Sequence, residues 1–88
     1  FRVQFRGSPV KRIGRDRFVR NCCISAGNSN NKNLLPDIIK LLMDDKSFIV
    51  RGAAVWAFQQ LSDKELYKHI KVKHLNIEKD TSVIQEWT

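Results

Sequence analysis

The chain has 88 residues and a net charge of +7, which allows one small domain of two or three helical layers. It contains no run of about 18 apolar residues, as a membrane-spanning helix would need, and no signal-peptide zones at its start. The sequence therefore predicts neither membrane insertion nor secretion, and we expect a cytoplasmic setting. The chain opens with Phe1 rather than Met, and its first residues look like the continuation of a segment. We therefore also expect a piece of a longer protein.

Positive charge gathers at the N-terminal end of the sequence. Residues 1–21 carry a net charge of +6, whereas residues 22–88 carry +1. A solvated face usually mixes both signs, so this one-sided cluster favours a polyanionic partner, with RNA or DNA ahead of an anionic membrane surface. The basic residues of the first segment are Arg2, Arg6, Lys11, Arg12, Arg15, Arg17 and Arg20.

The first predicted elements are a loop and a helix. Two glycines and a proline interrupt any periodicity over residues 7–14, which predicts a basic loop. Apolar spacings of three and four then predict a helix over 15–26, ended by the C-terminal pair Gly27 and Asn28. The sequence thus divides into a basic lead-in over 1–14 and a single domain over 15–88.

Further helices follow in order. After a turn over 27–33, Asn33 is expected to cap a helix over 34–43, and Ser47 the next, over 47–61. The latter is apolar on nearly all sides, as expected of a helix flanked on both faces. Ser62 or Asp63 is then expected to cap a weaker helix. The remaining predictions are that helix over 63–72, a turn over 76–81 and a final short helix from 82.

Helical spacing without alternating strand patterns predicts an all-α fold of about four to five helices. Val19 and Val50 lie in similar V-R segments 31 residues apart, and Val83 follows Val50 by 33. Such recurrence is typical of stacked antiparallel helix pairs, in which each pair covers the apolar stripe of the next. The segment after Asp44 and Asp45 looks like a HEAT repeat, so we expect a short HEAT-like solenoid.

Three stretches carry a family resemblance: GSPVKRIGRDRFVRNCCISAGNS, then LLMDDKSFIVRGAAVWAFQQL, then IEKDTSVIQEW. Together they resemble the C-terminal HEAT-like region of epoxyqueuosine reductase, over most of the chain. The most specific part runs from Ser8 to Asn28; the V-R-G-A-A segment is shared in kind with many HEAT proteins.

The resemblance implies an oxidoreductase that performs the last step of queuosine synthesis on the wobble base of a tRNA. Members of that family use cobalamin and two [4Fe–4S] clusters. Cluster ligation needs a C-x2-C-x2-C-x3-C-P run, which this sequence lacks. The resemblance therefore implies no cofactor and no catalysis in this chain, a missing N-terminal catalytic domain as partner, and tRNA bound at its anticodon region.

The predicted nucleic-acid site lies in the basic loop and the start of the first helix. Cationic side chains and free backbone N–H groups at such a place suit phosphate, so we expect contacts with RNA backbone rather than with bases. The alternative is that these cations form a solvated surface that keeps the protein soluble and binds no phosphate. The predicted site residues are Lys11, Arg12, Arg15, Arg17, Arg20 and Asn21.

The cysteines, Arg51 and the tryptophans are expected to have structural roles. Cys22 and Cys23 have no metal-ligand spacing and are expected to be plain core thiols. Arg51 is expected to be structural, with Asp44 or Asp45 as its candidate partners, and both tryptophans are expected in the core or at contacts between repeats. His69 and His74 show no carboxylate partner at helical spacing, so no metal or acid–base pair is predicted.

Two rival functions remain open at this point. One is a HEAT-type scaffold that binds another protein through an exposed groove. The other is a HEAT-like DNA glycosylase, which would need a carboxylate and aromatic side chains in a nucleic-acid groove. Its candidates, Asp16 and Trp56, have no supporting constellation.

Overall fold

The computed structural model describes residues 9–87, with side chains from residue 14 onward. Within these residues there are five α-helices, one 3-10 helix and no strand, which confirms the all-α class and the predicted number of helices. The elements are α1 (Pro9–Asn28), η1 (Lys32–Leu34), α2 (Leu35–Asp44), α3 (Phe48–Leu61), α4 (Lys64–Ile77) and α5 (Thr81–Glu86).

Three of the helices begin at a side-chain cap. The hydroxyl of Ser47 accepts a hydrogen bond from the backbone N–H of Val50 at the start of α3. Asp63 does the same for the first turn of α4, and Asp80 for that of α5. Such caps satisfy N–H groups that have no partner within the helix. The predicted cap at Ser47 is confirmed, and of the two candidates for α4 it is Asp63 that serves.

The basic loop expected over residues 7–14 is wrong from Pro9 onward, because α1 begins there. Proline suits the first turn of a helix, where a backbone N–H would have no partner. Gly14 is exposed within α1, and a Cβ added to it would meet nothing within 4 Å. Pro9 therefore marks the start of a helix, and Gly14 is a tolerated position inside it. Residues 7 and 8 lie outside the described residues.

Gly27 also has a different role from the one predicted. It lies inside α1, and a Cβ added to it would be 2.5 Å from Trp56 Cζ3 and 3.1 Å from Ala57 Cα. The residue is thus glycine because α3 passes close to the α1 backbone. The left-handed backbone conformation of the turn falls to Asn30, whose φ is 59°.

The caps and ends of two other helices differ from the prediction. Asn31, rather than Asn33, accepts a backbone hydrogen bond, and it caps η1. The helix α4 continues to Ile77 instead of ending near 72. Its buried face passes from Ile70 to His74, four residues apart and therefore on one side of the helix. Because His74 is polar, the apolar pattern of the sequence did not indicate that α4 continues through this last turn.

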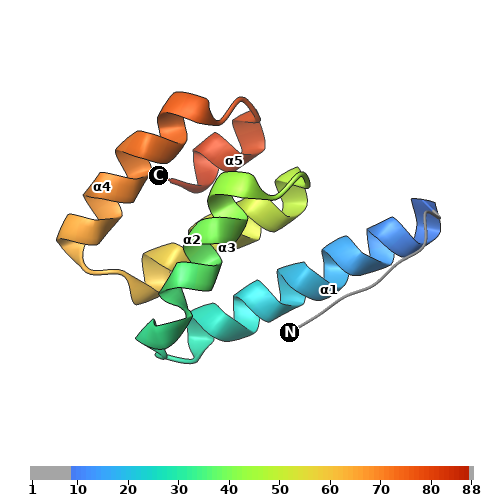
Figure 1. Ribbon diagram of the computed structural model, residues 1–88, viewed down its shortest axis with the longest axis horizontal. Coiled ribbons are helices and arrows are strands. Elements are labelled where there is room, and N and C mark those ends of the chain that lie inside the picture. The colour runs from blue at the N-terminus through green and yellow to red at the C-terminus, as the bar shows by residue number, and fades with distance from the viewer. Residues whose placement is uncertain (1–8, 88) are drawn as a thin grey trace.

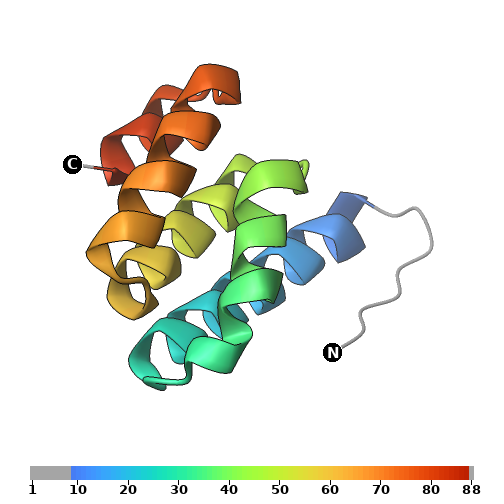
Figure 2. The same cartoon turned by 60° about the vertical axis from the view of Figure 1, so that its left-hand side comes forward.

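The helix α3 lies at the centre of the packing (Figure 1). It contacts α1 on one side and α5 on the other, while α2 covers a third side and α4 packs against α2. The helices α1 and α4 lie at opposite ends of the molecule in both views (Figures 1 and 2). A cation on α1 is therefore well separated from the lysines of α4.

The valines of the predicted repeat occupy matching places in the core. Val19, Val50 and Val83 are all fully buried, one each in α1, α3 and α5. One turn further along each helix stands a second buried residue, Cys23, Ala54 or Trp87. The recurrence read from the sequence thus corresponds to equivalent core positions in three helices that pack in succession.

Candidate nucleic-acid interface

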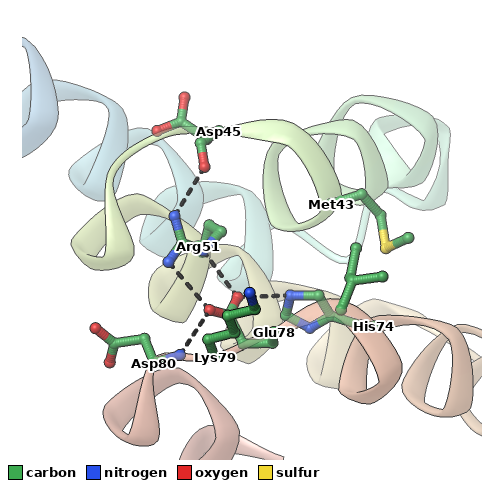
Figure 3. A pocket seen from close by; sticks show the side chains of 8 residues that line it. Met43, Asp45, Arg51, His74, Glu78, Lys79 and Asp80 are labelled. Atoms are coloured by element: carbon green, nitrogen blue, oxygen red, sulfur yellow. Dashed lines mark hydrogen bonds and ion pairs between the residues drawn. The ribbon is translucent and has the colours of Figure 1, made fainter.

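A buried polar network joins α3 to the end of α4 (Figure 3). Arg51 Nε donates to Glu78 Oε1 at 2.8 Å and Nη2 donates to Oε2 at 3.0 Å, while Nη1 donates to the backbone carbonyl of Asp45 at 2.9 Å. The backbone N–H of Asp80 donates to Glu78 Oε2 at 3.1 Å. Such a two-pronged arginine–carboxylate contact is geometrically specific as well as strong.

His74 connects this network to the C-terminal helix. Its Nε2 lies 2.9 Å from Glu78 Oε1, and its Nδ1 accepts a hydrogen bond from Trp87 Nε1 at 2.9 Å. Because the indole N–H only donates, Nδ1 carries no proton and Nε2–H donates to Glu78. Burial lowers the pKa of His74, a tendency that the nearby Arg51 reinforces and Glu78 opposes. The ring is therefore held neutral in one tautomer.

The network lines an open pocket of about 510 Å³, but its hydrogen-bonding groups are already occupied. Both ring nitrogens of His74 have partners, so neither is free to exchange a proton with a substrate. Burial alone would raise the pKa of Glu78, but the hydrogen bonds from Arg51 and the backbone of Asp80 lower it below its usual value. The cluster fixes α4 and α5 against α3, and we assign it no catalytic role.

Two sequence predictions are corrected here. Arg51 pairs with Glu78 and reaches only the backbone carbonyls of Asp45 and Lys46, so its expected pairing with Asp44 or Asp45 is wrong. The statement that no carboxylate stands beside the histidines at helical spacing is also wrong, because Glu78 follows His74 by four residues. That i,i+4 spacing was a usable signal.

Arg15, one of the predicted site residues, forms ion pairs within the protein. Its Nη2 lies 2.5 Å from Asp45 Oδ1, and its Nη1 lies 3.0 Å from Asp16 Oδ1. The hydrogen bond with Asp45 raises the pKa of Arg15. Burial would raise the pKa of Asp45, but the hydrogen bonds from Arg15 and the backbone of Ser47 lower it. Arg15 therefore ties α1 to the connection between α2 and α3.

The remaining predicted site residues lie on α1. Lys11 and Arg12 belong to its first turns, and their side chains lie outside the described residues. Arg17 and Arg20 are exposed. No ion pair among the described residues involves either of them. Arg20 Nη1 donates to the side chain of the exposed Asn21 at 3.3 Å.

The helix separates Arg15 from Arg17. Two residues apart on an α-helix means about 200° around its axis, so the two side chains leave opposite flanks. Arg17 and Arg20, three residues apart, share a flank with Ile24. The expected basic loop is part of a helix, and the predicted site arginines that are exposed and have no carboxylate partner among the described residues are Arg17 and Arg20.

Sequence reasoning missed an apolar groove beside these two arginines. Arg20 and Ile24 of α1 form one wall of a pocket of about 400 Å³. Across from them, α3 presents two large exposed residues, Phe48 at 50% and Ile49 at 42%. The other lining residues are Gly52, Ala53 and Trp56 of α3 with Ser82 and Glu86 of α5. Phe48, Gly52 and Trp56 recur every four residues, a stripe visible in the sequence but interpreted as core.

Cys23 is buried and Cys22 partly so, and neither forms a disulfide. Burial raises the pKa of the Cys23 thiol to about 11. Within residues whose side chains are described, no three His, Cys, Asp or Glu residues gather in a way that could hold a metal ion. These residues do not fit a [4Fe–4S] cluster.

The described part of the chain is a helical module with two exposed arginines beside an apolar groove. None of its helices is both long and apolar enough to cross a membrane. Comparison with family models and with solved structures yields no match for the chain.

Two curated proteins do match it. An uncharacterised protein in the gldA 3′ region of Geobacillus stearothermophilus is 33% identical over 73 residues, 83% of this chain and 33% of that protein. The epoxyqueuosine reductase of Listeria monocytogenes is 28% identical over 88 residues, all of this chain and 23% of that protein. The chain thus spans a third or less of these relatives. The second match supports a distant relation to epoxyqueuosine reductase.

Proposed function

We propose that this chain binds tRNA through the exposed cations of α1, as one module of a protein that acts in queuosine modification. The observation that carries the proposal is the pair Arg17 and Arg20, which are exposed and have no carboxylate partner among the described residues. Unpaired arginines on a chain of net charge +7 suit a phosphate backbone. The distant relation to a tRNA-modifying reductase supports RNA as the polyanion.

The module contributes binding rather than chemistry. His74 has both ring nitrogens hydrogen-bonded within the protein, and Cys23 is buried, so neither side chain supports a catalytic role in this proposal. In this proposal, cobalamin and the iron–sulfur clusters belong to other parts of the full protein. The equivalent buried positions of Val19, Val50 and Val83 support a HEAT-like stack as the frame that presents α1.

Salt dependence of tRNA binding tests the proposal. Fluorescence anisotropy with labelled tRNA, repeated over a range of salt concentrations, gives the slope of log affinity against log salt. If Lys11, Arg12, Arg17 and Arg20 each neutralise one phosphate, that slope is about −3 to −4. Replacing Arg17 and Arg20 together by Ala should reduce its magnitude by about one to two units.

The matched control removes two exposed lysines of α4, Lys68 and Lys73; this helix lies on the other side of the molecule from α1 (Figures 1 and 2). Replacing both by Ala lowers the net charge equally but should leave the slope nearly unchanged. If the two double variants weaken tRNA binding to the same extent, attraction comes from diffuse net charge and the proposed site does not exist.

The apolar groove gives one specific reason to keep a second candidate, a protein-binding scaffold. Exposed Phe48 and Ile49 are residues of the kind found at protein interfaces. The two candidates make different predictions for that groove.

A further inference from the structure

The groove beside Arg20 combines aromatic side chains with positive charge. Phe48 and Trp56 project from α3 two helical turns apart, about 12 Å along the axis, with Gly52 between them. Gly52 has no side chain to fill the space between the two rings. The large–small–large series leaves a notch in the lining of the groove, and the side chain of Glu86 borders it, 3.7 Å from where a Cβ on Gly52 would stand.

Charge is distributed unevenly around this notch. Arg20 lies in the α1 wall, and Arg17 stands on the same flank of α1 three residues earlier. Exposed Lys46 precedes Phe48 by two residues. On the opposite wall, Glu86 of α5 is the only carboxylate among the described lining residues. Phosphate is therefore attracted toward α1 and repelled from α5.

We infer that the groove receives unpaired bases of the bound RNA, with the exposed Phe48 as the main stacking surface and Trp56, which is partly buried against Gly27 and the core, at the other end of the groove. This inference rests on the proposed function. Proteins that bind single strands combine a cationic track for the backbone with aromatic side chains on which bases stack. The strand lies with its phosphates along Arg17 and Arg20 and its bases turned toward α5. Ser82 and Glu86 then offer hydrogen-bonding groups to base edges.

Charge complementarity favours RNA over a protein in this groove. Arg20 lines the groove, and two further exposed cations, Arg17 and Lys46, lie three residues from Arg20 and two residues from Phe48 in the sequence. A protein interface usually has a core depleted in charge. A base with its attached phosphate satisfies the aromatic and the cationic parts of this surface together.

The substitution Phe48→Leu tests stacking, because it keeps an apolar side chain and removes the ring. Binding is measured by anisotropy with a labelled 12-nucleotide single-stranded RNA and with a blunt duplex of the same sequence. Phe48→Leu should weaken binding of the single strand about fivefold or more. Affinity for the duplex and the salt slope should not change, since stacking releases no counterions.

Phe18→Leu is the matched control. Phe18 is 51% exposed, as Phe48 is, but it lies on the α1 flank away from Arg17 and Arg20. The control should leave both affinities unchanged. Intrinsic fluorescence adds a direct readout: single-stranded RNA should quench the wild-type signal, and Trp56→Phe should remove the quenching although buried Trp87 remains. Circular dichroism melts confirm that each variant folds.

The outcomes separate the inference from the proposed function. If Phe48→Leu leaves single-strand binding unchanged while the Arg17 and Arg20 double variant weakens it, the groove inference is wrong and RNA binding by α1 stands. If the wild-type protein binds no RNA, both are wrong. If Phe48→Leu changes self-association in sedimentation velocity without changing RNA affinity, the groove is a protein interface and the inference is overturned.

Discussion

Asp45 and Glu78, 33 residues apart, make the same two contacts in the α2–α3 and α4–α5 connections. Each accepts a backbone N–H from two residues later, Asp45 from Ser47 at 2.9 Å and Glu78 from Asp80 at 3.1 Å. Each also binds an arginine, Arg15 of α1 or Arg51 of α3. A carboxylate therefore fixes the entry to α3 and to α5 in the same manner.

This duplication accounts for the different behaviour of two equivalent arginines. Arg20 and Arg51 occupy the same position in their V-R segments. Arg51 binds Glu78 in the connection between α4 and α5, whereas Asp45, in the connection between α2 and α3, is bound by Arg15 rather than by Arg20. Arg20 consequently has no carboxylate partner among the described residues and remains exposed beside the groove.

Removing Arg51 should destabilise the protein strongly. The Glu78 side chain is 3% exposed, so Arg51→Ala leaves a buried carboxylate without its cation and should lower the free energy of unfolding by about 2–3 kcal/mol. Arg20→Ala, the equivalent exposed change, should stay within about 0.5 kcal/mol of wild type. Urea denaturation measures both. Equal stabilities of the two variants would contradict the role given to Arg51.

The protein should lose stability in mild acid. The folded-state pKa of His74 is lowered mainly by burial, so below about pH 6.5 the unfolded chain binds more protons than the folded one. The stabilisation that comes from neutral His74 is fully present above that pH, and it is lost as the pH falls toward the folded-state pKa of His74. Glu78, with its own lowered pKa, adds a further loss below its ordinary value of 4.5.

Urea midpoints between pH 8 and pH 5 measure this loss. In addition to the pKa effect, a protonated His74 would present Nδ1–H to the Trp87 N–H, placing two donors face to face. His74→Gln should flatten the profile between pH 7 and pH 5.5, whereas the same substitution at exposed His69 should leave its shape unchanged. A His74→Gln profile as steep as that of wild type would rule out His74 as the responsible group.

Two glycines of α1 should respond to alanine with opposite signs. Gly14→Ala adds a methyl group in open space and should raise the free energy of unfolding by up to about 1 kcal/mol through helix propensity. Gly27→Ala forces a Cβ against Trp56 and the α3 backbone. Overpacking of about 1–3 kcal/mol should outweigh the propensity gain. Thermal melts of both variants check the signs, and stabilisation by Gly27→Ala would mean that α1 and α3 lie further apart.

The sequence predicted the features that depend on local pattern. Apolar spacing located α2 and α3 to within a residue at each end, and the V-R recurrence identified three buried valines. Interpretation failed where the same local signal has two meanings. Glycine ends many helices, but Gly27 is needed at a close helix crossing. Proline interrupts many helices, but Pro9 begins one.

The contacts that define the polar network are set by tertiary packing. Arg15 meets Asp45 across 30 residues, and Arg51 meets Glu78 across 27. No spacing rule specifies which carboxylate each arginine finds. The groove likewise needs three helices to form its walls, so its aromatic stripe was taken for core. Only the i,i+4 pair of His74 and Glu78 was available from the sequence and overlooked.

The α5 wall of the groove depends most on contacts with other helices. The helix α5 has six residues, too few to be stable alone, and it is held by Trp87 through His74 and through the Tyr67 hydroxyl, which donates to the Trp87 carbonyl at 3.0 Å. Local unfolding of α5 would therefore remove one side of the groove, and it would also expose Val83 and Trp87, which are buried in the core beside α3. By thermodynamic linkage, any molecule bound against Ser82 and Glu86 suppresses that opening and slows amide hydrogen exchange in α5.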